Sequence, residues 1–163
     1  MDIQSFEYGI VSSLFLGTFT LRNKFCKAEE SKLPKIVSIK KLENKRIQTK
    51  FANELKIDFE TFNEKQPDQI IKLLFHGTSK TDPKEIYESD EGLDIRFSKF
   101  GMYGQGIYFA DNSRYSHNYA YKKVIDGVMH FFMLVCFVLP GHPFQAKQLM
   151  RDLRIPPVLR KPE

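Results

Sequence analysis

Cysteine is scarce in this chain, and several patterns that would point to a particular class of protein are missing. The two cysteines, Cys26 and Cys136, lie far apart and do not have the spacing of metal ligands. We expect free thiols in a reducing intracellular compartment, cytoplasmic or nuclear, rather than a disulfide. The chain has no internal repeat or low-complexity segment, and no Gly-Lys-Ser/Thr sequence of a phosphate-binding loop.

Long hydrophobic runs are also missing. The most apolar stretches, 10–21 and 128–139, are both shorter than the roughly 20 residues that a membrane-spanning helix needs. The first is broken by serine, threonine and glycine and follows Asp2 and Glu7, whereas a signal peptide begins with positive charge. We therefore expect a soluble protein with no membrane segment.

The positive charge of the chain is unevenly distributed. With 42% hydrophobic and 28% charged residues the composition is that of one globular domain, and the net charge is +5. Residues 22–50 hold ten Lys or Arg against three acids, whereas residues 51–141 hold ten against thirteen. Such a basic run is usually a solvated face, and the alternative is a surface for nucleic acid or another phosphate-rich partner.

Local signals predict helices mixed with strands. Apolar residues recur at helical spacing after Asn44, a candidate N-cap, at Ile47, Phe51, Leu55, Phe59 and Phe62. A short helix is expected after Asp82 as N-cap, with Pro83 at its first position and Glu85 closing a capping box, ending near Gly92. Another is expected to begin within the cap residues 111–113.

Apolar runs predict strands at 35–42, 70–75 and 106–110, and a buried central strand at 128–139 that ends before Pro140-Gly141. Residues 1–35 have no readable pattern. Helices and strands do not alternate regularly, which favours an α+β fold over a doubly wound sheet.

The stretch "GMYGQGIYFADNSRYSHNYAY" (101–121) combines three glycines with five tyrosines. A buried tyrosine hydroxyl needs a hydrogen-bond partner, so this cluster indicates a surface that holds a flat, partly polar ligand. The glycines read G-x-x-G-x-G, the reverse of the dinucleotide fingerprint, and on their own indicate a tight turn.

A second cluster, "HGT" at 76–78, follows the apolar run that ends at Phe75. A lone histidine at a strand end is usually structural, but here a ring nitrogen, small-residue amides and a hydroxyl can bind a sugar hydroxyl and an amide side by side. The histidines, including His117 on an expected helix surface and His130 on an expected strand, show no metal-ligand arrangement, so no metal is expected.

The segments "LLFHGTS", "GMYGQGIYFADNS" and "YSHNYA", in this order and spacing, resemble the catalytic domain of poly(ADP-ribose) polymerases. The residues of these segments are most similar to those of the tankyrase and macrodomain-associated branches, many of which transfer single ADP-ribose units. The resemblance covers residues 36–163 and leaves 1–35 as a lead-in segment. It implies the ADP-ribosyltransferase fold, with split antiparallel sheets and short helices.

The resemblance implies that NAD is the substrate and assigns roles to particular residues. His76 would bind the ribose hydroxyls, while the Gly77 backbone and the Ser116 hydroxyl would hold the nicotinamide carboxamide. Tyr119 would stack on the nicotinamide ring, and Tyr108 would flank it and act with His76 as the catalytic pair. The remaining binding residue, on the adenosine side, would be Thr78.

In this family a third catalytic position lies on a late strand, with glutamate there or, in single-unit transferases, an apolar residue. Nothing in the printed chain matches that strand, so we expect the C-terminal strands to be absent and transfer by this chain to be weak. The expected function is ADP-ribose transfer from NAD to a protein or nucleic-acid acceptor. The alternatives are a catalytically inactive NAD or ADP-ribose binding module and a basic nucleic-acid interaction domain.

Overall fold

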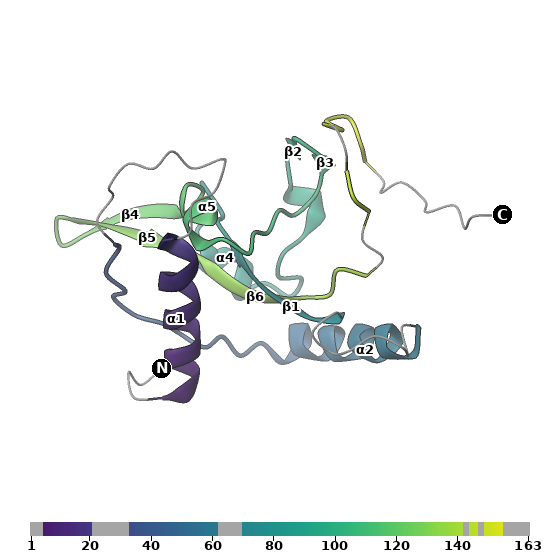
Figure 1. The fold of residues 1–163 in the computed structure, drawn as a ribbon, viewed down its shortest axis with the longest axis horizontal. Helices are drawn as coiled ribbons and strands as arrows, with labels where there is room; N and C mark the ends of the chain where they lie inside the picture. The colour runs from purple at the N-terminus through teal and green to yellow at the C-terminus, as the bar shows by residue number, and fades with distance from the viewer. Residues whose placement is uncertain (1–4, 21–32, 62–69, 142–143, 147–148, 155–163) are drawn as a thin grey trace.

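Short helices and antiparallel strand pairs make up the described part of the chain. The computed structural model describes residues 5–20, 33–61, 70–141, 144–146 and 149–154. All strands pair antiparallel, so this part of the chain is of the α+β class, as expected (Figure 1). In chain order the elements are α1 (Phe6–Thr20), α2 (Lys45–Thr61), β1 (Lys72–His76), α4 (Pro83–Tyr87), a 3-10 turn (Ile95–Phe97), β2 (Phe100–Gly101), β3 (Gly104–Gln105), α5 (Ser113–His117), β4 (Tyr121–Ile125), β5 (Val128–Phe132) and β6 (Leu134–Val138).

The core lies where the C-terminal half of α1 meets Phe75 of the sheet formed by β1 and β6. Phe75 of β1 pairs with Val135 of β6 and has no solvent exposure. The Phe15 ring of α1 meets the Phe75 ring edge-on at 6.2 Å and the Phe19 ring at 5.6 Å. The lead-in, whose pattern was not readable, therefore contains a helix that packs against Phe75 of β1.

Buried hydrogen bonds join α1 to the start of α5. The Ser113 hydroxyl donates to the Phe15 carbonyl at 2.6 Å, and the Thr18 hydroxyl donates to Ser113 Oγ at 3.0 Å. The Asn112 side-chain amide donates to the Thr18 carbonyl at 2.9 Å. Asn112 and Ser113 are both buried, and these bonds satisfy their polar groups far from water.

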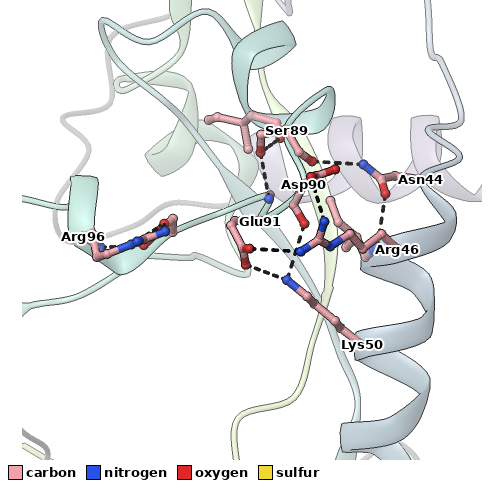
Figure 2. A network of polar contacts seen from close by, with 11 residues as sticks. Asn44, Arg46, Lys50, Ser89, Asp90, Glu91 and Arg96 are labelled. Carbon is pink, nitrogen blue, oxygen red and sulfur yellow. Dashed lines mark hydrogen bonds and ion pairs between the residues drawn. The ribbon is translucent and has the colours of Figure 1, made fainter.

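Figure 2 shows a charged network that ties the first turns of α2 to the loop after α4. Arg46 pairs with Asp90 at 2.7 Å, and Lys50 pairs with Glu91 at 2.5 Å. The Lys50 ammonium lowers the pKa of the Glu91 carboxyl by hydrogen bonding and by charge. The Asn44 side chain caps α2 by accepting from the Ile47 amide, as expected, and donates to the carbonyls of Tyr87 and Ser89.

The expected helix starts are present. Asp82 caps α4 by accepting from the Lys84 amide, with Pro83 at the first helical position. Asn112 caps α5 by accepting from the Tyr115 amide. The helix α4 ends at Tyr87, earlier than expected from Gly92, because Ser89 folds back to bond the Ile86 carbonyl and the Gly92 amide. Phe62, the last residue of the expected apolar face of α2, lies outside the described residues.

Two expected strands are wrong. Residues 35–42 have no strand conformation, and Val37 is largely exposed. Residues 106–110 form only a single bridge, between Ala110 and Phe75. The Tyr108 carbonyl lies 2.8 Å from the His76 side chain, so that side chain takes the place of a strand partner.

The expected central strand at 128–139 is also wrong as one element. It is divided between β5, which pairs with β4, and β6, which pairs with β1. Asp126 and Gly127 have φ of 49° and 75°, as in the turns of tight hairpins, and they fold β4 onto β5. Most of β5 is consequently exposed on a hairpin that projects away from the β1–β6 sheet (Figure 1).

Cys136 lies in β6 and is a free thiol whose pKa burial raises to about 11. Cys26 lies outside the described residues. Across the described ranges, every helix is too short or too polar to cross a bilayer.

Candidate functional site

The residues singled out in the sequence meet at the C-terminal end of β1. Phe75 and Ala110 exchange backbone hydrogen bonds of 2.8 and 3.0 Å, which hold residues 108–110 beside this end of the strand. His76, the next residue, places its Nδ1 2.8 Å from the Tyr108 carbonyl oxygen and its ring 5.4 Å from the Phe109 ring. A carbonyl can only accept, so Nδ1 carries the proton and Nε2 of the neutral ring remains an acceptor.

Gly77 approaches the end of α5 more closely than any other residue type could. A Cβ at this position would lie 2.5 Å from the Ser116 carbonyl oxygen and 2.6 Å from that of Tyr119. Both atoms belong to the backbone, which cannot move aside as a flexible side chain would. Among the described residues, neither the amide nor the carbonyl of Gly77 has a hydrogen-bond partner. Each is therefore able to bind a ligand.

Ser116 is buried and connects α5 to β1. Its hydroxyl donates to the Phe75 carbonyl at 3.1 Å, and the side chain belongs to a residue that is only 4% exposed. A hydroxyl that donates once can still accept through its lone pairs. Ser116 can therefore accept from a ligand N–H, but it has no second proton to donate.

Tyr108 uses its hydroxyl to hold the β2–β3 hairpin. The hydroxyl donates to the Gly104 carbonyl at 2.7 Å and accepts from the Tyr103 amide at 3.0 Å. Its ring lies against Gly101, where a Cβ would come within 2.7 Å of the phenol carbon and oxygen. The hydroxyl thus positions the hairpin, and the ring is the part of Tyr108 that can contact a flat ligand.

Tyr119 has an exposed ring on a fixed backbone, whereas the Thr78 hydroxyl is bonded within its own turn. Tyr119 is 48% exposed and its ring lies 5.5 Å from that of Tyr115, tilted by 54°. The Tyr119 backbone is fixed, because its carbonyl accepts from the Ser79 amide at 2.7 Å. Thr78 instead donates its hydroxyl to the Thr81 carbonyl at 2.5 Å, which closes the turn after the strand.

His117, expected on the helix surface, is partly exposed, and its ring packs in an aromatic cluster that was not expected. Its ring stacks on Phe131 of β5 at 4.6 Å and meets Phe19 of α1 edge-on at 5.4 Å. Burial lowers the pKa of the imidazole, and the charge of Lys122 lowers it further. The sequence spacing of these residues contains no signal for this cluster, because each comes from a different element.

A polar hollow lies beside Tyr119, and no pattern in the sequence predicted it. It has a volume of about 420 Å³ and is lined by Ser79, Lys80, Asn118, Tyr119, Ala120, Tyr121 and Lys122. Its members lie in two segments that only the fold brings together. Within the described ranges no three His, Cys, Asp or Glu side chains gather to hold a metal ion, and His142 lies outside them.

Two comparisons with known proteins indicate the same family. The profile of the poly(ADP-ribose) polymerase catalytic domain matches residues 17–155, which begins inside α1 and before the boundary expected at residue 36. A probable poly(ADP-ribose) polymerase of Dictyostelium discoideum is 36% identical over 151 residues, covering 91% of this chain and 41% of that protein. The chain thus spans less than half the length of this relative. With most of its length matched, the chain belongs to the poly(ADP-ribose) polymerase catalytic domain family.

Proposed function

We propose that this domain binds NAD at the end of β1 and transfers ADP-ribose from it to a protein acceptor, releasing nicotinamide. The observation that carries the proposal is the contact of Gly77 with Ser116 and Tyr119. It places an unpaired backbone amide and carbonyl beside a buried hydroxyl and an exposed tyrosine ring.

The nicotinamide carboxamide has one acceptor and two N–H donors. The Gly77 amide would donate to its oxygen, while the Gly77 carbonyl and Ser116 Oγ would accept from its nitrogen. The lone pairs of the Ser116 hydroxyl suit this role, because its only proton is already bonded to the Phe75 carbonyl. Three such bonds fix the rotation of the ring in its plane.

The ring of NAD is a pyridinium cation, which is attracted to the electron-rich faces of tyrosine side chains by about 0.5–2 kcal/mol each. Tyr119 is exposed enough to stack on it, and the ring of Tyr108 would flank it. We keep Thr78 on the adenosine side as a proposal, although its hydroxyl closes its own turn.

The reaction would break the C–N bond between ribose and nicotinamide. Both electrons of that bond go to the ring nitrogen, so nicotinamide leaves neutral and needs no general acid. The ribose becomes oxocarbenium-like, and an acceptor oxygen then forms a bond to the same carbon and loses its proton to water. His76, as an Nε2 acceptor, would bind a ribose hydroxyl and hold the sugar as this cation develops.

Half of the six cations in the described part of the basic run, residues 33–50, form ion pairs within the chain. In its described part, Lys41 pairs with Glu7, Arg46 with Asp90 and Lys50 with Glu91. These intramolecular ion pairs occupy cations that a nucleic-acid surface would need for phosphates.

Calorimetry with benzamide, a nicotinamide mimic, tests the site. We expect Tyr119→Ala to weaken benzamide binding about tenfold or more, which corresponds to about 1.4 kcal/mol. Tyr8→Ala, at the opposite end of α1 from the core contact, should bind like the wild type. Equal heats from wild type and Tyr119→Ala would contradict the proposal.

Transfer is tested separately with NAD labelled in its ADP-ribose part. Nicotinamide release together with labelled protein supports the transferase. Benzamide binding with neither product would favour the alternative, an NAD-binding module without catalysis.

A further inference from the structure

The polar hollow beside Tyr119 has the chemistry of an anion site. Lys80 and Lys122 are among its lining residues, together with Ser79 and Tyr121, and no lining residue carries a carboxylate. Among the described residues, neither Lys80 nor Lys122 forms an ion pair. A small concave surface with two unpaired cations concentrates anions at its mouth.

The loop that brings Lys80 to the hollow is held in an unusual conformation. Ser79 has φ of 57°, a left-handed conformation that is costly for a residue other than glycine. Its amide donates to the Tyr119 carbonyl at 2.7 Å, and this bond fastens the loop to the segment that carries Lys122. The strain is therefore maintained by a contact that closes one wall of the hollow.

Lys122 comes from the second segment that lines the hollow. The Lys122 ammonium lies 5.5 Å from the centre of the Phe131 ring, across the β4–β5 pair, and this contact limits where the side chain can go. Lys123, the next residue, does not line the hollow.

We propose that this hollow is an anion subsite that binds a phosphate or carboxylate group of a ligand engaged at the adjoining Tyr119 site. This inference rests on the proposed function, since Tyr119 belongs both to the hollow and to the nicotinamide site. The anion has two sources: the diphosphate of the dinucleotide, or an acidic side chain of the acceptor placed beside the reacting ribose.

Binding of inorganic pyrophosphate, ADP-ribose and benzamide to the full chain tests the subsite. We expect Lys80→Glu and Lys122→Gln each to weaken pyrophosphate binding by about tenfold or more, as loss of a charged hydrogen bond does, and benzamide binding to stay unchanged. Higher salt should weaken pyrophosphate binding in the wild type. Lys123→Glu is the matched control for Lys80→Glu, because it makes the same charge change at a lysine that does not line the hollow.

The remaining arms distinguish the sources of the anion. Parallel loss of ADP-ribose affinity in Lys80→Glu assigns the subsite to the donor diphosphate. Unchanged ADP-ribose affinity with weaker binding of a glutamate-rich peptide assigns it to the acceptor. Pyrophosphate binding that Lys80→Glu and Lys122→Gln leave intact, or that Lys123→Glu weakens equally, overturns the subsite. Loss of benzamide binding in Tyr119→Ala is read independently, so failure of the nicotinamide site and failure of the subsite are distinguishable.

Discussion

Gly77 is the residue on which the proposed nicotinamide site depends most directly. Its missing side chain lets the backbone after β1 lie against the Ser116 and Tyr119 carbonyls. This approach leaves its amide and carbonyl unpaired within the described part of the chain. A single methyl group at this position would push the segment after β1 away from the end of α5.

We expect Gly77→Ala to lower the free energy of unfolding by about 1–3 kcal/mol, as overpacking does, and to weaken benzamide binding by at least about tenfold. Thermal melts and calorimetry measure the two effects. Gly106→Ala is the control, because a Cβ there meets nothing within 4 Å. Wild-type binding by Gly77→Ala would show that the Gly77 backbone does not form the site.

At the scale of the element, α5 is a short helix fixed on three sides. Ser113 bonds to α1, Ser116 bonds to β1, and His117 packs on β5. Tyr119 follows shortly after the end of α5. A change in the packing of α5 would therefore alter the position of Tyr119 in the proposed ligand site. His117 is the titratable group in this packing.

Stability should therefore fall as the pH falls below about 6.5, the ordinary value for histidine. The pKa of His117 is lowered in the folded state, first by burial and then by Lys122, so the unfolded chain binds the proton more readily. The stabilisation is present above pH 6.5 and is lost as the pH falls through the folded-state value. Denaturant melts between pH 5 and pH 8 measure the slope.

Replacing the imidazole separates this effect from general acid denaturation. His117→Phe keeps an aromatic ring between Phe19 and Phe131 but cannot titrate, and it should flatten the slope in this pH range. An unchanged slope in His117→Phe would mean that another group is responsible.

At the scale of the whole molecule, few side chains form the core. The fully or nearly buried apolar residues in the described ranges are Phe19, Ile70, Phe75 and Ala120. Several large apolar side chains of β5 and β6 remain exposed, among them Phe131 and Phe137. Phe75 is the residue at which α1, β1 and β6 meet.

We expect Phe75→Ala to cost about 3–5 kcal/mol. Because small domains are typically stable by only about 5–15 kcal/mol, this loss is a large part of the free energy of unfolding and should lower the melting temperature clearly. Circular dichroism during thermal denaturation measures it. Phe137→Ala, on the same face of the sheet but 67% exposed, should change stability by no more than about 0.5 kcal/mol. Comparable losses from the two variants would contradict the assignment of the core.

Local features were predictable from the sequence because neighbouring residues determine them. Asn44, Asp82 and Asn112 cap helices where cap residues precede them, and the apolar run before His76 is a strand. The Asp126-Gly127 turn is equally local, but it was not predicted. The strand after this turn was therefore expected to be part of one central strand, whereas it belongs to a hairpin. The strand expected at 35–42 is wrong. β-Branched residues favour the extended conformation, but they do not by themselves provide a neighbouring strand to pair with.

By itself the sequence determined the family, through three ordered motifs, and with it the residues that gather at the end of β1. Only the tertiary structure decided which of their polar groups remain available to a ligand. The Tyr108 hydroxyl is bonded to its hairpin, the Ser116 proton is bonded to the Phe75 carbonyl, and the His117 ring packs against two phenylalanines from distant elements. A hydrogen bond or a buried contact needs both partners in place, and partners far apart in sequence meet only when the chain has folded.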